Sequence, residues 1–95
     1  SAGDFASEMQ PTNVKQKSVV AVYYLREIVG LSAISVDHVY TYFKAAGWPV
    51  PADVPNTLQQ AGTEGWLDTA DSQAILITTS GENLIEHQLS KKASK

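Results

Sequence analysis

Hydrophobic residues recur every three or four positions through most of this chain, which is the spacing of amphipathic helices. The first such segment covers residues 14–29. Asn13 can cap its start, because its side-chain oxygen can accept a hydrogen bond from a free backbone N–H, and Gly30 can end it in the left-handed conformation. At 100° per residue, one broad face of this helix gathers the apolar positions Val14, Ala21, Val22, Leu25, Ile28 and Val29.

Two shorter helices are predicted next. The second covers residues 36–46, with Ser35 as its cap and Gly47 as its stop. The third begins near Asp53, another good cap, and ends near Gly62. The positions expected to face inward are Val36, Val39, Tyr40 and Phe43 in the second helix and Val54, Leu58 and Ala61 in the third.

The last third of the chain predicts a hairpin followed by a helix. Two β-prone runs, WLDT at 66–69 and AILIT at 74–78, are separated by turn-forming residues that include Asp71. Thr79 and Glu82 have the spacing of a capping box, so we expect the final helix to begin there. Its apolar side would consist of Leu84, Ile85 and Leu89.

The predicted order is helix, helix, helix, strand, strand, with a short extended link after the first helix. Three runs of sequence are characteristic of it. These are AAGW at 45–48, EGWLDT at 64–69 and ILITTSGENLIEH at 75–87. In this order and with these runs, residues 14–90 resemble the winged-helix family. The resemblance implies an α+β, mainly α fold, with a three-helix core, a short β-hairpin wing and a C-terminal helix.

The ends of the chain differ from this middle part. Residues 1–13 are small and polar, and we interpret them as a flexible leader or linker, while residues 91–95 read as a basic flexible tail. The chain has 95 residues, 43% of them hydrophobic, which suits one domain with a single core. Cysteine is absent, which is compatible with the cytoplasm, and no apolar run is long enough to span a bilayer. We expect an accessory domain of a larger cytoplasmic protein, with residues 1–13 as its linker.

The winged-helix resemblance implies that the third helix enters the major groove of DNA with the hairpin beside it. The residues that would then read bases are Asn56, Thr57, Gln59, Gln60 and Thr63. However, none of the seven Lys and Arg residues falls between Lys44 and Lys91, and the net charge is −3. Because phosphate contacts need cations, duplex DNA is disfavoured as a partner and is kept as the alternative.

Residues with catalytic potential are few and scattered. His38 and His87 are the only histidines, they lie far apart in the sequence, and neither belongs to a metal-binding or nucleophile–base pattern. The chain also has no cysteine nucleophile and no glycine-rich phosphate loop. We therefore predict no enzyme activity, no cofactor, no metal and no small-molecule substrate.

The run VVAVYYL at 19–25 is apolar on all sides of the first helix, although a two-layer domain needs only one apolar face. Either the C-terminal helix or a protein partner, such as a second copy, could cover the extra face. We expect the C-terminal helix to cover part of it and Tyr23 to stay exposed as an anchor. The candidates for protein contact are Val19, Val20, Tyr23 and Tyr42. The predicted function is therefore that of a non-enzymatic interaction module, acting through a protein partner or as a homodimer.

Overall fold

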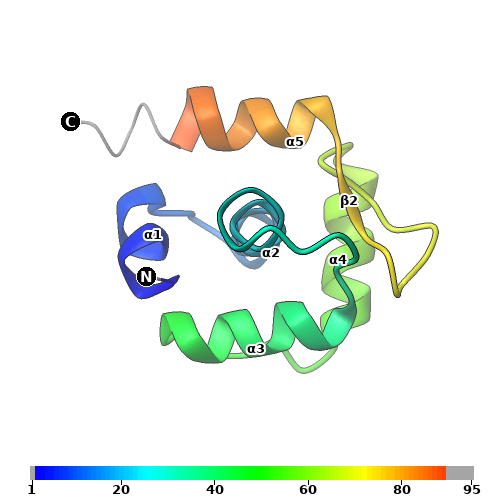
Figure 1. Cartoon of the computed structure of the whole chain (residues 1–95), viewed down its shortest axis with the longest axis horizontal. Helices are drawn as coiled ribbons and strands as arrows, with labels where there is room; N and C mark the ends of the chain where they lie inside the picture. The colour runs from blue at the N-terminus through cyan, green and yellow to red at the C-terminus, as the bar shows by residue number, and fades with distance from the viewer. Residues whose placement is uncertain (1, 90–95) are drawn as a thin grey trace.

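A computed structural model describes residues 2–89 of the chain (Figure 1). In chain order the elements are α1 (Ala2–Met9), α2 (Val14–Tyr23), η1 (Tyr24–Val29), α3 (Val36–Ala46), α4 (Val54–Thr63), β1 (Leu67–Asp68), β2 (Leu76–Ile77), α5 (Thr79–Asn83) and η2 (Leu84–Leu89). The segments η1 and η2 are π-helical and directly continue α2 and α5. The described residues are mostly helical and include one two-stranded sheet, which confirms the predicted α+β, mainly α fold class.

The predicted starts of the first three helices are confirmed by single hydrogen bonds, and the predicted ends of the first two by their glycines. The side-chain oxygens of Asn13, Ser35 and Asp53 each accept from the backbone N–H three residues further on. Gly30 and Gly47 have φ values of 86° and 76°, the left-handed conformation that favours glycine. Local side-chain chemistry therefore sets where these helices begin and end.

The start of the last helix differs by one residue from the prediction. The cap is Thr78, whose hydroxyl accepts from the Gly81 N–H at 3.0 Å and donates to the Gly65 carbonyl. The expected capping box of Thr79 and Glu82 is therefore wrong. The reason is tertiary, because the bond to Gly65 holds Thr78 in an extended conformation at the end of the hairpin.

The hairpin is short and antiparallel, and it pairs Leu67 with Ile77 and Asp68 with Leu76. Asp71 forms the predicted turn by accepting from a backbone N–H two residues on, at 2.9 Å. The Ile75 N–H donates to the Ile34 carbonyl at 2.8 Å. This bond ties the extended link between η1 and α3 to the hairpin.

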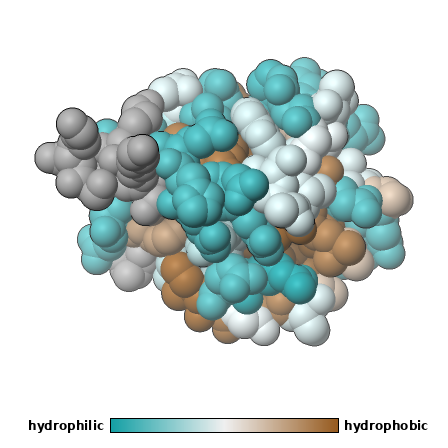
Figure 2. All heavy atoms as spheres, turned by 90° about the horizontal axis from the view of Figure 1, so that it is seen from above, coloured by the Kyte–Doolittle hydropathy of each residue, from teal (hydrophilic) through white to brown (hydrophobic). Residues whose placement is uncertain are grey.

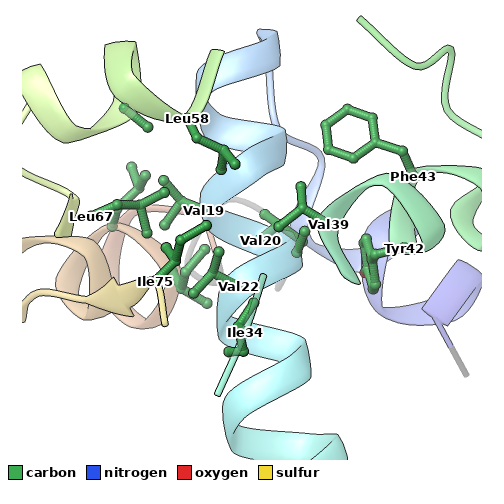
Figure 3. Close-up of a cluster of buried hydrophobic side chains, with 14 of the residues drawn as sticks. Val19, Val20, Val22, Ile34, Val39, Tyr42, Phe43, Leu58, Leu67 and Ile75 are labelled. Carbon is green, nitrogen blue, oxygen red and sulfur yellow. The ribbon is translucent and has the colours of Figure 1, made fainter. Parts of the chain in front are cut away.

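Helix α2 lies at the centre of the fold, with α1, α3, α4, β2 and α5 arranged around it (Figure 1). Five consecutive α2 residues, Ser18–Val22, are buried, which is possible only for a helix that is covered on all sides. The Ser18 hydroxyl donates to the Val14 carbonyl at 3.1 Å, so this polar side chain is buried with a partner. The surrounding elements contribute Ile34, Val39, Phe43, Leu58, Leu67 and Ile75 to the same core (Figure 3).

The prediction that residues 1–13 form a flexible leader is wrong for Ala2–Met9, which form helix α1. Ala6 and Met9 are buried against the core, and Ala2 and Phe5 are partly buried. These four residues have the spacing of one helical face, but the small and polar residues between them hide that pattern. Residues 91–95, the predicted tail, lie outside the described residues.

Candidate functional site

Three of the four residues proposed for protein contact belong to the core. Val19 and Val20 are fully buried, and Tyr42 is 3% exposed. Helices α1 and η2 both pack against α2, and α1 also packs against α3, which explains why these side chains are covered. The prediction that Val19, Val20 and Tyr42 form a contact surface is therefore wrong.

Tyr42 and Tyr40 have the reverse of the exposures expected from the sequence, because Tyr42 is buried and Tyr40 is exposed. The Tyr42 hydroxyl donates to the Ala2 carbonyl at 3.2 Å, so α1 covers the ring. Tyr40, expected in the inner stripe of α3, is instead 46% exposed. The sequence analysis placed no helix over this side of α3, and α1 is what reverses the two tyrosines.

Tyr23 is half-buried between α1 and η2. Its ring stacks on Phe5 with 5.9 Å between centroids, and its hydroxyl donates to a Glu86 carboxylate oxygen at 2.9 Å. Its expected role as an exposed anchor is therefore wrong. Tyr23 instead connects the first and last helices of the domain.

Raising the pH should weaken this connection. Burial, the hydrogen bond to Glu86 and nearby carboxylates raise the pKa of Tyr23 from 10.0 to about 12. Since the unfolded chain keeps the ordinary pKa, the stabilisation is complete below about pH 10 and is lost as the pH rises through about 12. We expect alkaline unfolding in this range. Tyrosinate absorbance and circular dichroism measure it. Tyr23→Phe should make stability less dependent on pH there, and an unchanged dependence would contradict this role.

Aromatic rings continue from Tyr23 across the face that α1 covers. Successive rings lie 5.2–5.9 Å apart in the order Tyr23, Phe5, Tyr24, Tyr42, Trp48 and Phe43. The Lys17 ammonium lies 5.5 Å from the centroid of the Trp48 ring. The rings pack on one another, from the partly buried Phe5, Tyr23, Tyr24 and Trp48 to the buried Tyr42 and Phe43.

The outer face of α4 matches four of the five positions proposed for base readout. Asn56, Gln59, Gln60 and Thr63 are exposed on it. Thr57 is buried, and its hydroxyl donates to the Asp53 carbonyl at 3.1 Å. Thr57 is therefore wrong as a base-reading candidate, because it lies on the same side of the helix as the core residues Val54, Leu58 and Ala61.

The cations of the described residues are mostly remote from the α4 face. Lys15 reaches the end of α4, where it forms an ion pair with Glu64 at 2.7 Å. Lys44 lies over the ring of Tyr40, and Arg26 lies 3.6 Å from the Glu27 carboxylate. Lys15, which reaches the end of α4, is thus paired with an acid. This arrangement supplies little of the counterion release that drives DNA binding.

A small hollow lies where α4 meets the hairpin. Its lining residues are Val36, Pro55, Leu58, Gln59, Thr69, Ser72 and Ile75. Its volume is about 30 Å³, room for water, whereas ligand pockets span roughly 300–1,000 Å³. The hollow therefore does not suit a small-molecule substrate.

The sequence analysis missed an exposed apolar surface at the end of η1. Ile28 and Val29, both expected to face the core, are each 53% exposed, and Leu25 and Leu31 are partly buried beside the core. A π-helix closes hydrogen bonds to the fifth residue and turns by less than 100° per residue, so the apolar stripe of α2 does not continue in phase. The adjacent charges of Arg26 and Glu27 were the one sequence signal that this turn meets solvent.

Figure 2 views the molecule from the α5 side. Hydrophobic atoms lie in separate groups at the lower left and to the right of centre, with hydrophilic atoms between them. The large hydrophobic residues exposed in the described part of the chain are Val14, Ile28, Val29, Tyr40 and Leu76, and among these only Ile28 and Val29 are neighbours in sequence. Large contiguous apolar patches mark contact surfaces, and this adjacent pair is the candidate for such a surface in the described residues.

Within residues 2–89, no group of three or more His, Asp or Glu side chains could hold a metal ion. No helix in the described part of the chain is long and apolar enough to cross a membrane. Comparisons of the chain with protein-family models, curated proteins and solved structures give no match. Its function is therefore inferred from its own surfaces.

Proposed function

We propose that this chain is a non-enzymatic winged-helix module that acts through protein contacts, as an accessory domain of a larger cytoplasmic protein. The contact surface is the end of η1. The observation that carries this proposal is the adjacent pair Ile28 and Val29, each 53% exposed at the end of the central helix. Covering such a pair with a partner removes apolar area from water, which favours association.

The winged-helix assignment is supported by the order and position of the elements. Helix α4 packs beside β1, as a recognition helix does beside its wing. The bond from the Ile75 N–H to the Ile34 carbonyl adds the link before α3 to the hairpin, like a third short strand. The helix-and-hairpin face is the one that would meet DNA in a nucleic-acid-binding member of this family.

We prefer protein contact to DNA binding for two reasons, one at the α4 face and one at the end of η1. The α4 face offers amides and hydroxyls, but its neighbouring lysine, Lys15, is paired with Glu64. The η1 end offers aliphatic side chains flanked by Arg26 and Glu27, which form an ion pair with each other. An apolar centre with a charged rim is the usual composition of a protein interface. Reading of duplex DNA by α4 and the hairpin remains the alternative.

One cross-linking experiment distinguishes the two functions. A photoreactive phenylalanine analogue replaces Ile28 in one variant and Gln60, on the α4 face, in a matched variant. Both are irradiated in cells of the source organism, and the adducts are treated with nuclease or protease. We expect position 28 to give discrete protein adducts that disappear when Val29→Asp is added, because a charge at the patch opposes apolar contact.

The position-60 variant provides the control. It should give no discrete adduct, since no contact is proposed there. Nuclease-sensitive adducts at position 60, with none at position 28, would favour DNA reading and overturn the proposal. Adducts at position 28 that persist with Val29→Asp would show that the patch does not specify the contact, which would also contradict it.

A further inference from the structure

Helix α1 has the pattern of a helical ligand seated in a groove. Ala2, Phe5, Ala6 and Met9 follow the i, i+3, i+4, i+7 spacing by which an amphipathic helix presents one face to a groove. The groove is formed by α2 and α3, both of which contact α1. Ala6 and Met9 are buried in it, so α1 covers core residues that would otherwise meet water.

The aromatic contacts of α1 identify its main anchor. The Phe5 ring lies 5.9 Å from the Tyr23 ring and 5.4 Å from the Tyr24 ring, measured between centroids. The Tyr42 hydroxyl adds one hydrogen bond, to the Ala2 carbonyl. These contacts define what the groove accepts, namely a short helix with an aromatic residue between two small residues and a flexible aliphatic residue one turn later.

The connection from α1 to α2 is strained at one position. Gln10 has a φ of 49°, a conformation that residues other than glycine rarely adopt. It also precedes Pro11, and a residue before proline prefers the extended region. From Thr12 onward the chain is fastened to α2, because the Thr12 N–H and hydroxyl both donate to the Gln16 side chain. The hinge is thus confined to Gln10 and Pro11.

We propose that α1 exchanges between two copies of this chain, each copy placing its α1 in the α2–α3 groove of the other. Opening the hinge lets Gln10 adopt the extended conformation that Pro11 favours, and this movement carries α1 away from its own groove. A second copy offers α1 the same contacts, so the exchange relieves strain at both hinges without losing packing. An eight-residue helix is not stable alone in water, so a released α1 needs such a groove.

The exchange uses a different surface from the η1 end and does not depend on the proposed function. It also differs from simple association of two closed domains, because the contacts of Phe5 become intermolecular. Isotope-filtered NMR separates these cases. Isotope-labelled and unlabelled chains are mixed, unfolded together and refolded at millimolar concentration. We expect a dimer by light scattering, with intermolecular Overhauser effects between Phe5 of one copy and Tyr23 and Tyr24 of the other.

Two variants of Gln10 test whether strain at the hinge favours the exchange of α1. Gln10 is exposed, so replacing it changes mainly the backbone preference. Gln10→Gly tolerates the positive φ and should weaken dimerisation by about tenfold or more, since each dimer contains two relieved hinges. Gln10→Val opposes the positive φ and should strengthen dimerisation by a similar factor. Both dissociation constants follow from sedimentation equilibrium.

Each alternative outcome has a clear meaning. A chain that stays monomeric at millimolar concentration, including as the Gln10→Val variant, overturns the exchange. A dimer in which the Phe5 contacts remain intramolecular also overturns it, and dissociation of that dimer by Val29→Asp would place the contact at η1 instead. Equal dissociation constants for Gln10→Gly and Gln10→Val would contradict the role of the hinge.

Discussion

Replacing Leu58 with alanine should lower the free energy of unfolding by about 2–5 kcal/mol, the range for removing a large buried side chain. Leu58 is 2% exposed and extends from α4 toward the central helix α2 (Figure 3). Alanine leaves a cavity at this junction, because the structure around a removed side chain relaxes only partially. Urea denaturation, followed by circular dichroism, measures the effect.

The neighbouring residue is the matched control. Gln59 is exposed on the outer face of α4, so Gln59→Ala should change the free energy of unfolding by less than about 0.5 kcal/mol. Both variants keep the helix propensity high, so the comparison isolates packing from helix formation. Equal losses for the two variants would mean that the inner face of α4 is assigned to the wrong residues.

Gly81→Ala should destabilise the domain by about 3 kcal/mol, as inserting a methyl group into a closely packed site does. Gly81 is buried at the start of α5, and a Cβ atom there would overlap the carbonyl oxygen of Trp66 and lie 2.7 Å from Cγ1 of Ile77. The Trp66 oxygen also accepts the Thr78 N–H, so it cannot shift without loosening the hairpin. The requirement is for space, since Gly81 does not have a positive φ.

Gly3 provides the control for this substitution. It lies within α1 with no atom near its missing Cβ, so Gly3→Ala should be neutral or stabilising by up to about 1 kcal/mol. Thermal unfolding of the two variants under the same conditions gives the comparison. A Gly81→Ala variant as stable as Gly3→Ala would show that α5 does not approach Trp66 so closely.

Local signals were sufficient for α3 and α4. Ser35, Gly47 and Asp53 act through bonds to residues three to five positions away, so the sequence alone specifies where these helices start or end. The turn at Asp71 is equally local. Predictions failed where a distant residue decides the outcome, as when the Gly65 carbonyl draws Thr78 into the role of cap.

The candidate site was harder to predict, because the burial of a side chain depends on which helix or strand packs over it. Val19 and Val20 were correctly placed on an extra apolar face of the first helix, but α1 was not recognised as a helix that packs on the domain. Ile28 and Val29 fit the inner face of an ideal α-helix, and only the π-helical turn brings them to the surface. Nothing in the residue spacing alone distinguishes an α-helical turn from a π-helical one.

The central position of α2 also determines when the chain can fold during its synthesis. Residues Ser18–Val22 leave the ribosome before η2, which supplies part of their cover through Leu84, Ile85 and Leu89. Until Leu89 has emerged, the nascent chain exposes a run of valines that has no complete core to enter. Folding of this core therefore follows the synthesis of nearly all of residues 2–89, and in that interval the exposed valines raise the risk of aggregation.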